Sequence, residues 1–178
     1  MTAQRHDFDA APFRLEELPW SPRFSLRVRP QNRAALEGAL GLTLPARIGE
    51  RSMTGGTEVL CLGPDEWTVL VPESGRDALV DAGARIYAQT PHSLVEISDR
   101  EITLRLSGPQ ALTALTAGCP RDVEALQTGR AARTLFDSAT VILWRDGADS
   151  FRMDVWRSFL PHVRAILDKV AAELKSGL

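Results

Sequence analysis

Residues 23–29 read Arg23-Phe24-Ser25-Leu26-Arg27-Val28-Arg29, and this stretch decides the fold. Its apolar and polar side chains alternate, which is the pattern of a β-strand with one buried face and one polar face. Pro30 ends the strand. The sequence then predicts a helix over 33–40, with Asn32 at its start and Gly41 as its C-terminal stop.

The rest of the first half follows from the same signals. Residues 42–57 are predicted to be a loop, and residues 59–62 and 67–71 are predicted to be two strands of a hairpin with turn residues 63–66 at its tip. A second helix is expected to open at Glu73 or Ser74, with Leu79, Ala82 and Ile86 on its apolar face. Residues 93–97 are predicted to be a further strand.

The second half repeats this order about 80 residues later. Residues 102–106 alternate like residues 24–28, a short helix is predicted over 110–117, and strands are predicted over 132–136, 140–144 and 151–155. Asp146-Gly147 is a strong hairpin signal, and a last helix is expected to start near Ser158.

The repeated order predicts an α+β fold made of two ferredoxin-like halves about a pseudo-twofold axis, each half with the order strand, helix, hairpin, helix. The halves are expected over 23–98 and 99–178, as one compact module. Residues 1–22 hold three prolines and show neither helical nor strand periodicity, so we expect an extended N-terminal arm outside the core.

Composition narrows the class of protein. The chain has 178 residues, 44% hydrophobic and 25% charged, with a formal net charge of −2, which disfavours a dedicated nucleic-acid binder. It contains no apolar run of transmembrane length and begins with polar residues, so a cytoplasmic location is expected. Cys61 and Cys119 are expected to be buried, unreactive thiols.

Several residues are of types that can catalyse a reaction or bind a ligand, but a structural role explains each of them better. His92 and Glu96 would lie roughly 13 Å apart on a strand, which is too far for a shared metal ion. Gly55-Gly56 predicts a turn more than an anion cradle, since no phosphate-binding motif surrounds it. The remaining candidates are Ser158, read as a helix cap; Asp65-Glu66, read as solvated; and Asp99, read as a turn residue. The residues therefore predict no catalytic, cofactor-binding or metal site, and favour a binding or structural module over an enzyme.

Three segments carry a resemblance. They are Leu62-Gly63-Pro64-Asp65-Glu66-Trp67; residues 93–100 running into 104–109; and Gly118-Cys119-Pro120-Arg121-Asp122 with Gly129-Arg130 and Arg133-Thr134-Leu135 downstream. Together with Phe151-Arg152 and Arg157-Ser158-Phe159, they resemble the gamma subunit of heterotetrameric sarcosine oxidase over roughly residues 24–170. Glu101 departs from this pattern, where an aromatic residue is expected, and so does the stretch 123–126. The middle segment is also similar to the folate-binding part of the glycine-cleavage T-protein, an aminomethyltransferase.

The resemblance implies a complex of four different chains that oxidises sarcosine with oxygen. The expected products are glycine and hydrogen peroxide, and the one-carbon unit passes to tetrahydrofolate as methylene-tetrahydrofolate. It also implies that FAD, FMN, NAD and the folate site belong to partner subunits and none to this chain. Its partners would be the alpha and beta large subunits and the small delta subunit. The alternative is a stand-alone folate-dependent aminomethyltransferase-like enzyme or folate-binding module, although a full T-protein is about twice this length.

Two features predict where the large subunits dock. The N-terminal arm carries apolar anchors, Phe13, Leu15, Leu18 and Trp20, with no periodicity for an element of its own. Trp156 falls on the polar face of its strand, and aromatic residues are enriched at protein interfaces. The competing interpretation is that both features pack against their own domain.

Overall fold

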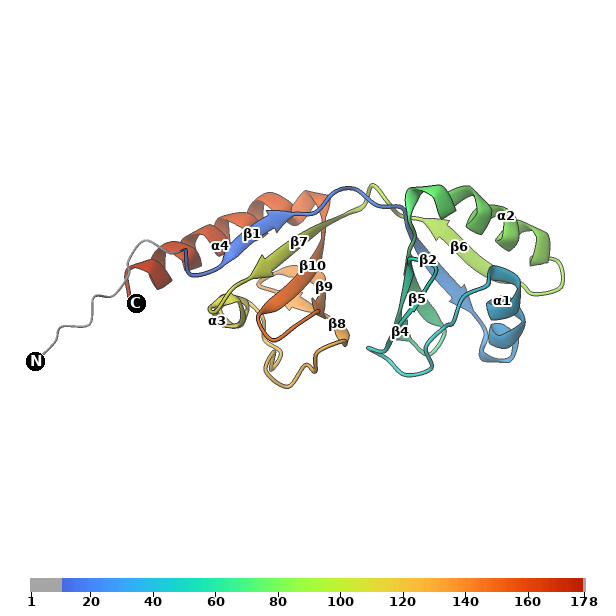
Figure 1. Ribbon diagram of the computed structural model, residues 1–178, viewed down its shortest axis with the longest axis horizontal. Helices are drawn as coiled ribbons and strands as arrows, with labels where there is room; N and C mark the ends of the chain where they lie inside the picture. Colours follow the sequence, from blue (N-terminus) through green and yellow to red (C-terminus); the bar gives the residue numbers. More distant parts are fainter. Residues whose placement is uncertain (1–10, 178) are drawn as a thin grey trace, which may run out of the picture.

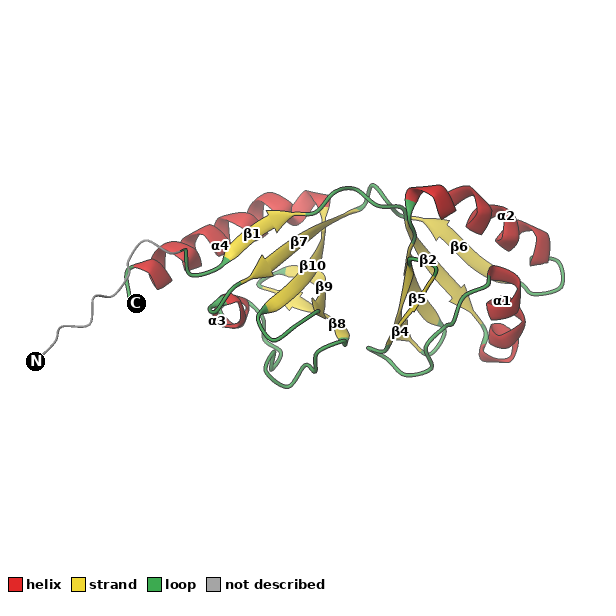
Figure 2. Cartoon of the chain, viewed as in Figure 1, coloured by secondary structure: helices red, strands yellow, loops and turns green. Residues whose placement is uncertain are grey.

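The computed structural model describes residues 11–177 and folds into two sheets, each covered by helices (Figure 1). The helices are α1 (Arg33–Leu40), α2 (Arg76–Ile86), α3 (Ala111–Thr116) and α4 (Leu160–Lys175). The strands are β1 (Arg14–Glu17), β2 (Arg23–Val28), β3 (Arg51–Thr54), β4 (Thr57–Gly63), β5 (Glu66–Leu70), β6 (His92–Glu96), β7 (Glu101–Ser107), β8 (Ala131–Phe136), β9 (Ala139–Arg145) and β10 (Ser150–Trp156). The mixture of helices and sheets confirms the predicted α+β class (Figure 2).

The two sheets have the same internal order. One runs β3-β4-β5-β2-β6 and the other runs β8-β9-β10-β7-β1, with every recorded strand pair antiparallel. Without the outer hairpin strand β3, the first order is that of a ferredoxin-like unit, in which the first strand lies between the third and the fourth. The repeated sequence pattern therefore folds into two units with the same spatial order of strands, although the edge strand of the second unit, β1, comes from the start of the chain.

β1 corrects the expectation that residues 1–22 form an arm outside the core. It pairs with β7 from Arg14↔Ser107 to Glu17↔Leu104 and takes the edge position that β6 takes in the other sheet. Phe13, just before it, is buried in the core of the second half. The first ten residues of the predicted arm lie outside the described residues. Four residues without a repeating apolar pattern form a strand here because β7 offers them an open edge.

β3 corrects a second expectation, because residues 51–54 were predicted to belong to a loop. Its residues Arg51–Thr54 pair with Thr57–Leu60 of β4 across the Gly55-Gly56 turn. An edge strand in which Met53 is the single apolar residue carries no apolar alternation, so the period-2 signal misses it. Both turn glycines have positive φ, 55° and 84°, which the two-residue hairpin requires.

Three apolar clusters hold the layers together. The outer face of each sheet packs on its own helices: Phe24, Leu26 and Val28 belong to one such core, and Leu104, Phe151 and Val163 belong to the other. A third, smaller cluster joins the inner faces of the two sheets through Leu60, Ala131, Ile142 and Trp144. The sheets thus face each other, with the helices outside. Among residues 11–177, no helix is long and apolar enough to cross a membrane.

Candidate functional site

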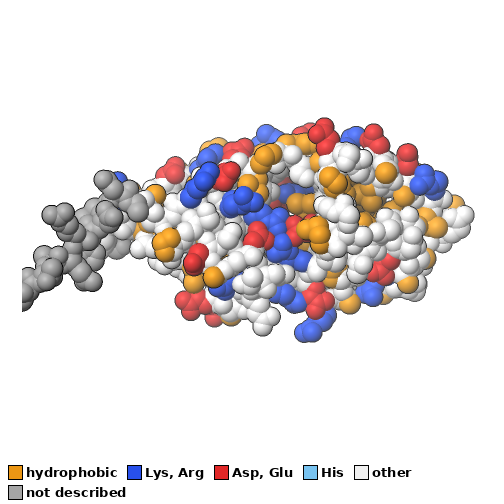
Figure 3. Space-filling model, in the orientation of Figure 1, with side chains coloured by type: hydrophobic (Ala, Val, Ile, Leu, Met, Phe, Trp, Pro, Cys, Tyr) orange, Lys and Arg blue, Asp and Glu red, His pale blue; other side chains and the backbone are white. Residues whose placement is uncertain are grey.

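The polar faces of the two sheets meet at the junction between the halves, and four of their charged side chains, Arg23, Glu58, Glu101 and Asp154, are buried there. Arg23 comes from β2, Glu101 from β7 and Asp154 from β10, and all three are buried. Strand alternation aims these side chains away from the helices, and the opposite sheet then covers them. Charged side chains gather at the centre of the face drawn in Figure 3.

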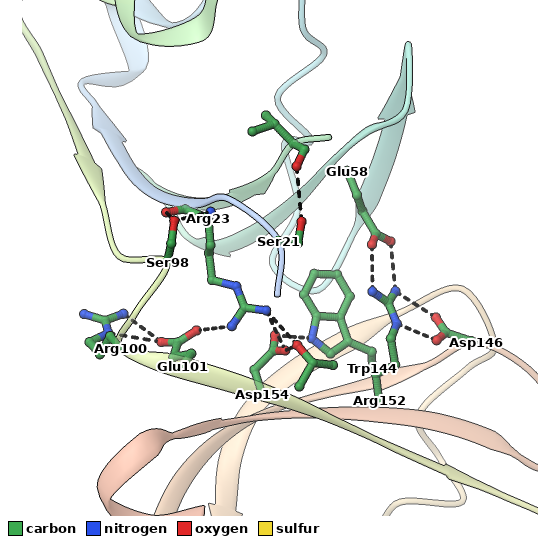
Figure 4. Close-up of polar contacts among 12 residues, drawn as sticks. Ser21, Arg23, Glu58, Ser98, Arg100, Glu101, Trp144, Asp146, Arg152 and Asp154 are labelled. Atoms are coloured by element: carbon green, nitrogen blue, oxygen red, sulfur yellow. Dashed lines mark hydrogen bonds and ion pairs between the residues drawn. The ribbon is translucent and has the colours of Figure 1, made fainter. Parts of the chain in front are cut away.

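Arg23 is the centre of the first cluster (Figure 4). Its Nη1 donates to Glu101 Oε2 at 2.7 Å, and its Nη2 donates to Asp154 Oδ1 at 2.9 Å and to Thr103 Oγ1 at 2.8 Å. Asp154 Oδ2 accepts from the indole Nε1 of Trp144 at 2.6 Å. A guanidinium from the first half is therefore paired with two carboxylates of the second half, so that the buried charges compensate each other.

A second cluster lies beside it and joins Glu58 of the first half to Arg152 of the second. Arg152 contacts Glu58 Oε2 at 3.0 Å and Asp146 Oδ2 at 2.6 Å. Arg51 is ion-paired with both Glu58 and Asp146. The guanidinium groups of Arg51 and Arg152 also lie 5.0 and 4.7 Å from the ring centroid of Trp144, within the range of cation–π attraction.

These contacts shift the pKa of two groups in the second cluster. Burial raises the pKa of Asp146, but the hydrogen bonds and charges of Arg152 and Arg51 outweigh burial and hold it below its usual value. Burial lowers the pKa of Arg152, but its hydrogen bonds to Asp146 and Glu58 raise it above its usual value. Both groups are therefore charged at neutral pH.

A cavity of about 460 Å³ opens between the sheets beside the first cluster. Glu66 lies in its wall and joins the halves a third time, since Arg133 of β8 contacts it with Nη1 at 3.1 Å and Nη2 at 2.5 Å. Arg27 of β2 lies 3.1 Å from the same carboxylate. The hydrogen bond from Arg133 is the main cause that holds the pKa of Glu66 below its ordinary value, against the opposing effect of burial.

The candidates from the sequence do not converge on this cavity, with the exception of Glu66. The structure corrects the expectation that Asp65-Glu66 is solvated: Asp65 is half exposed, while Glu66 is largely buried and ion-paired. Ser158 does not cap α4, whose N-cap residue is Phe159. Asp99 lies in the turn between β6 and β7, as predicted.

His92 and Glu96 lie on the same face of β6, opposite Val28 and Phe24 of β2. The imidazole Nδ1 of His92 hydrogen-bonds to the Thr90 carbonyl at 2.7 Å, and Glu96 pairs with Arg76. Within residues 11–177, no three His, Cys, Asp or Glu side chains gather as a metal site would require. Cys61 and Cys119 are buried and free, and burial is the main cause that raises the pKa of Cys61.

Sequence reasoning missed the junction clusters. The alternation of side chains identifies the polar faces of the strands around Arg23 and Asp154, but it does not indicate that a second sheet covers them. The available signal was the repeated order of elements, because two similar halves that carry charges of both signs on their sheet faces can dock face to face.

The chain matches the family model of the sarcosine oxidase gamma subunit over residues 27–173. Sarcosine oxidase subunit gamma of Corynebacterium sp. (strain U-96) is 35% identical over 153 residues, which cover 83% of this chain and 74% of the relative. The subunit gamma of Arthrobacter sp. is 34% identical over 142 residues, 77% of this chain and 69% of the relative.

Solved structures agree with the sequence matches. A chain of the heterotetrameric sarcosine oxidase from Corynebacterium sp. U-96, solved with pyrrole 2-carboxylate, superposes with a TM-score of 0.83 at 32% identity, over 93% of this chain and 87% of that chain. Aminomethyltransferase T of the glycine cleavage system from Bartonella henselae shares the fold, with a TM-score of 0.66 at 14% identity over 90% of this chain and 46% of that chain. The family model, the identities and the superposition together show that this chain belongs to the sarcosine oxidase gamma subunit family.

Proposed function

We propose that this chain is the gamma subunit of a four-chain sarcosine oxidase and acts there as a structural partner. The observation that carries the proposal is the 0.83 TM-score to a chain of a heterotetrameric sarcosine oxidase, at 32% identity over 93% of this chain. The assembled enzyme would oxidise sarcosine with oxygen and tetrahydrofolate to glycine, hydrogen peroxide and methylene-tetrahydrofolate. FAD, FMN, NAD and tetrahydrofolate would bind to its partners, the alpha, beta and delta subunits. We propose that this complex is cytoplasmic.

The state of the charged groups at the junction supports a structural role. Glu58, Glu101 and Asp154 are each held by arginines from the opposite half or from their own sheet. A general acid or base has to exchange a proton near neutral pH, whereas carboxylates paired in this way serve to hold two sheets together. The ion pairs at the junction thus hold the two halves together.

We propose that the large subunits dock on two exposed tryptophan side chains of this chain. Trp20 and Trp156 are 50% and 44% exposed, which is high for the side chain that most often anchors protein interfaces. Trp20 follows β1, so the part of the predicted arm after the strand keeps its proposed docking role, whereas Phe13 and Leu15 pack against the core of their own half.

Co-expression of the four chains tests the proposal. Complexes that carry Trp20→Ala or Trp156→Ala should lose this chain on affinity purification through a large subunit, while the isolated variants keep the circular dichroism of the wild type. Val80→Ala, at another exposed apolar position, is the matched control and should co-purify. Full retention of both tryptophan variants would contradict the docking surface.

The non-catalytic role has its own test. An assembled complex with Glu66→Gln in this chain should turn over sarcosine at a rate within about twofold of the wild type per bound flavin, since the carboxylate is engaged in an ion pair and not in proton transfer. A loss of a hundredfold or more in a complex of normal composition would contradict the role. So would stoichiometric flavin in the isolated chain, or tetrahydrofolate binding with aminomethyltransferase activity.

A further inference from the structure

The polar groups that line the cavity between the sheets offer more hydrogen-bond donors than acceptors. Arg27, Arg100 and Arg133 line it together with Glu66, Glu101 and Asp154. Their positions come from both halves: β2 and β5 supply one wall, and β7, β8, β10 and the turn before β7 supply the other. The cavity is therefore formed only when the halves dock.

The acceptors in this wall are occupied. Both oxygens of Glu66 accept from Arg133, and Glu101 accepts from Arg100 through Oε1 and from Arg23 through Oε2. Asp154 accepts from Arg23 and Trp144 through its two oxygens. Every carboxylate oxygen of this wall already accepts a hydrogen bond from an arginine or tryptophan side chain, so these carboxylates offer a ligand with further donors, such as an ammonium group, less acceptor capacity than free carboxylates.

The donors, in contrast, exceed the acceptors. Arg100 and Arg133 each use two N–H-bearing nitrogens on one carboxylate, and among residues 11–177 their third nitrogen has no recorded acceptor. Each guanidinium carries five N–H donors in all. The Thr68 hydroxyl, which is buried in the same wall, has no hydrogen-bond partner within the described part of the chain. An unpartnered buried hydroxyl is costly, and a ligand that supplies an acceptor removes that cost.

Apart from the hydroxyl groups of Ser25 and Thr140, the rest of the lining is apolar. Leu62, Ile97, Ile142 and the half-exposed indole of Trp156 border the cavity. Apolar walls with a few convergent polar groups are the usual form of a small-molecule site, and this volume lies within the usual range. Free guanidinium donors select a carboxylate, and the apolar walls select a ligand with an apolar body.

We propose that this cavity binds a small organic carboxylate with an apolar body, whose oxygens accept hydrogen bonds from Arg133, Arg100 and Thr68. A free molecule fits better than an acidic side chain of a partner protein, because Thr68 lies in the buried part of the wall. The site rests on the geometry of this chain alone and does not depend on the proposed subunit role.

Isothermal titration of the full chain tests the site with benzoate as the probe. Benzoate should bind saturably at one site per chain, with a millimolar or tighter dissociation constant. Benzylamine, which has the same ring and the opposite charge, should show no saturable binding, and inorganic phosphate should not displace benzoate. Binding of both ring compounds, of neither, or displacement by phosphate would overturn the proposal.

Two variants locate the site. Thr68→Val removes the unpartnered hydroxyl at nearly constant shape, and Arg133→Gln removes the charge but keeps an amide donor; each should weaken benzoate by about tenfold or more. Arg121→Gln, at an exposed position outside the cavity, is the matched control and should bind like the wild type. Thr68→Val leaves a core without an unpaired hydroxyl, so it should fold at least as stably as the wild type. Unchanged affinity in both site variants would place benzoate elsewhere and refute the assignment.

Discussion

Replacement of Arg23 by methionine should be among the most destabilising single changes in this protein. The side chains of Arg23, Glu101 and Asp154 are 5%, 4% and 1% exposed, so removal of the guanidinium leaves two buried carboxylates without the partner that they share. Breaking one partner of a buried ion pair costs about 3–5 kcal/mol. Asp154 keeps the hydrogen bonds from Thr103 and Trp144, which points to the lower end, about 3 kcal/mol.

Urea denaturation followed by circular dichroism measures this loss. The midpoint should fall at an unchanged slope, because the area exposed on unfolding is nearly the same. Adding Glu101→Gln and Asp154→Asn to Arg23→Met should recover at least half of the loss, since the buried charges are then gone. Arg164→Met is the matched control: Arg164 pairs with Glu17 at 2.9 Å, but both side chains are about 40% exposed, so the cost should stay below about 1 kcal/mol. Equal losses in Arg23→Met and Arg164→Met would refute the view that this cluster holds the halves together.

Two further predictions concern backbone fit and acid stability. A Cβ at Gly49, where φ is +83°, would lie 2.6 Å from the Ala131 carbonyl oxygen of the other half, so Gly49→Ala should cost about 1–3 kcal/mol or more. Gly38→Ala, in α1 with open space around it, should instead stabilise by about 0.5–1 kcal/mol, and equal effects of the two variants on the thermal midpoint would contradict this account. The folded pKa of Glu66 lies below its unfolded value, so the unfolded chain takes up its proton first and stability falls as the pH drops below about 4.3. The urea midpoint should therefore fall less between pH 6 and this acid range for Glu66→Gln than for the wild type. An equal fall in both proteins would show that the ion pair with Arg133 does not contribute to stability.

The sequence by itself determined the helices and strands other than β1 and β3, and the face that each turns to its own core. Residues 33–40 form α1 with the predicted bounds, and Gly41 ends the helix in the left-handed conformation with φ 64°. Phe24, Leu26 and Val28 are buried under the helices, as their alternation predicts. These features depend on contacts within one turn of helix or one strand, where the period of the side chains is set by the backbone alone.

The family, too, was determined by sequence. The string at 62–67, the segments at 93–109 and the run that starts at 118 carried the resemblance to the sarcosine oxidase gamma subunit, and the family model confirms it over residues 27–173. Each of these motifs lies within a single stretch of the chain, and so it can be recognised without coordinates.

Only the tertiary structure decided what lies beyond the polar faces. The alternation of side chains along a strand shows that Arg23 and Asp154 point away from the helices, but it does not show whether water or another sheet lies on that side. Likewise, nothing local predicts that β1 closes the second sheet beside β7, since the pairing joins residues about ninety positions apart. Burial of the polar faces, the ion clusters and the cavity all arise when two halves of complementary charge dock, which is a property of the pair and not of either strand pattern.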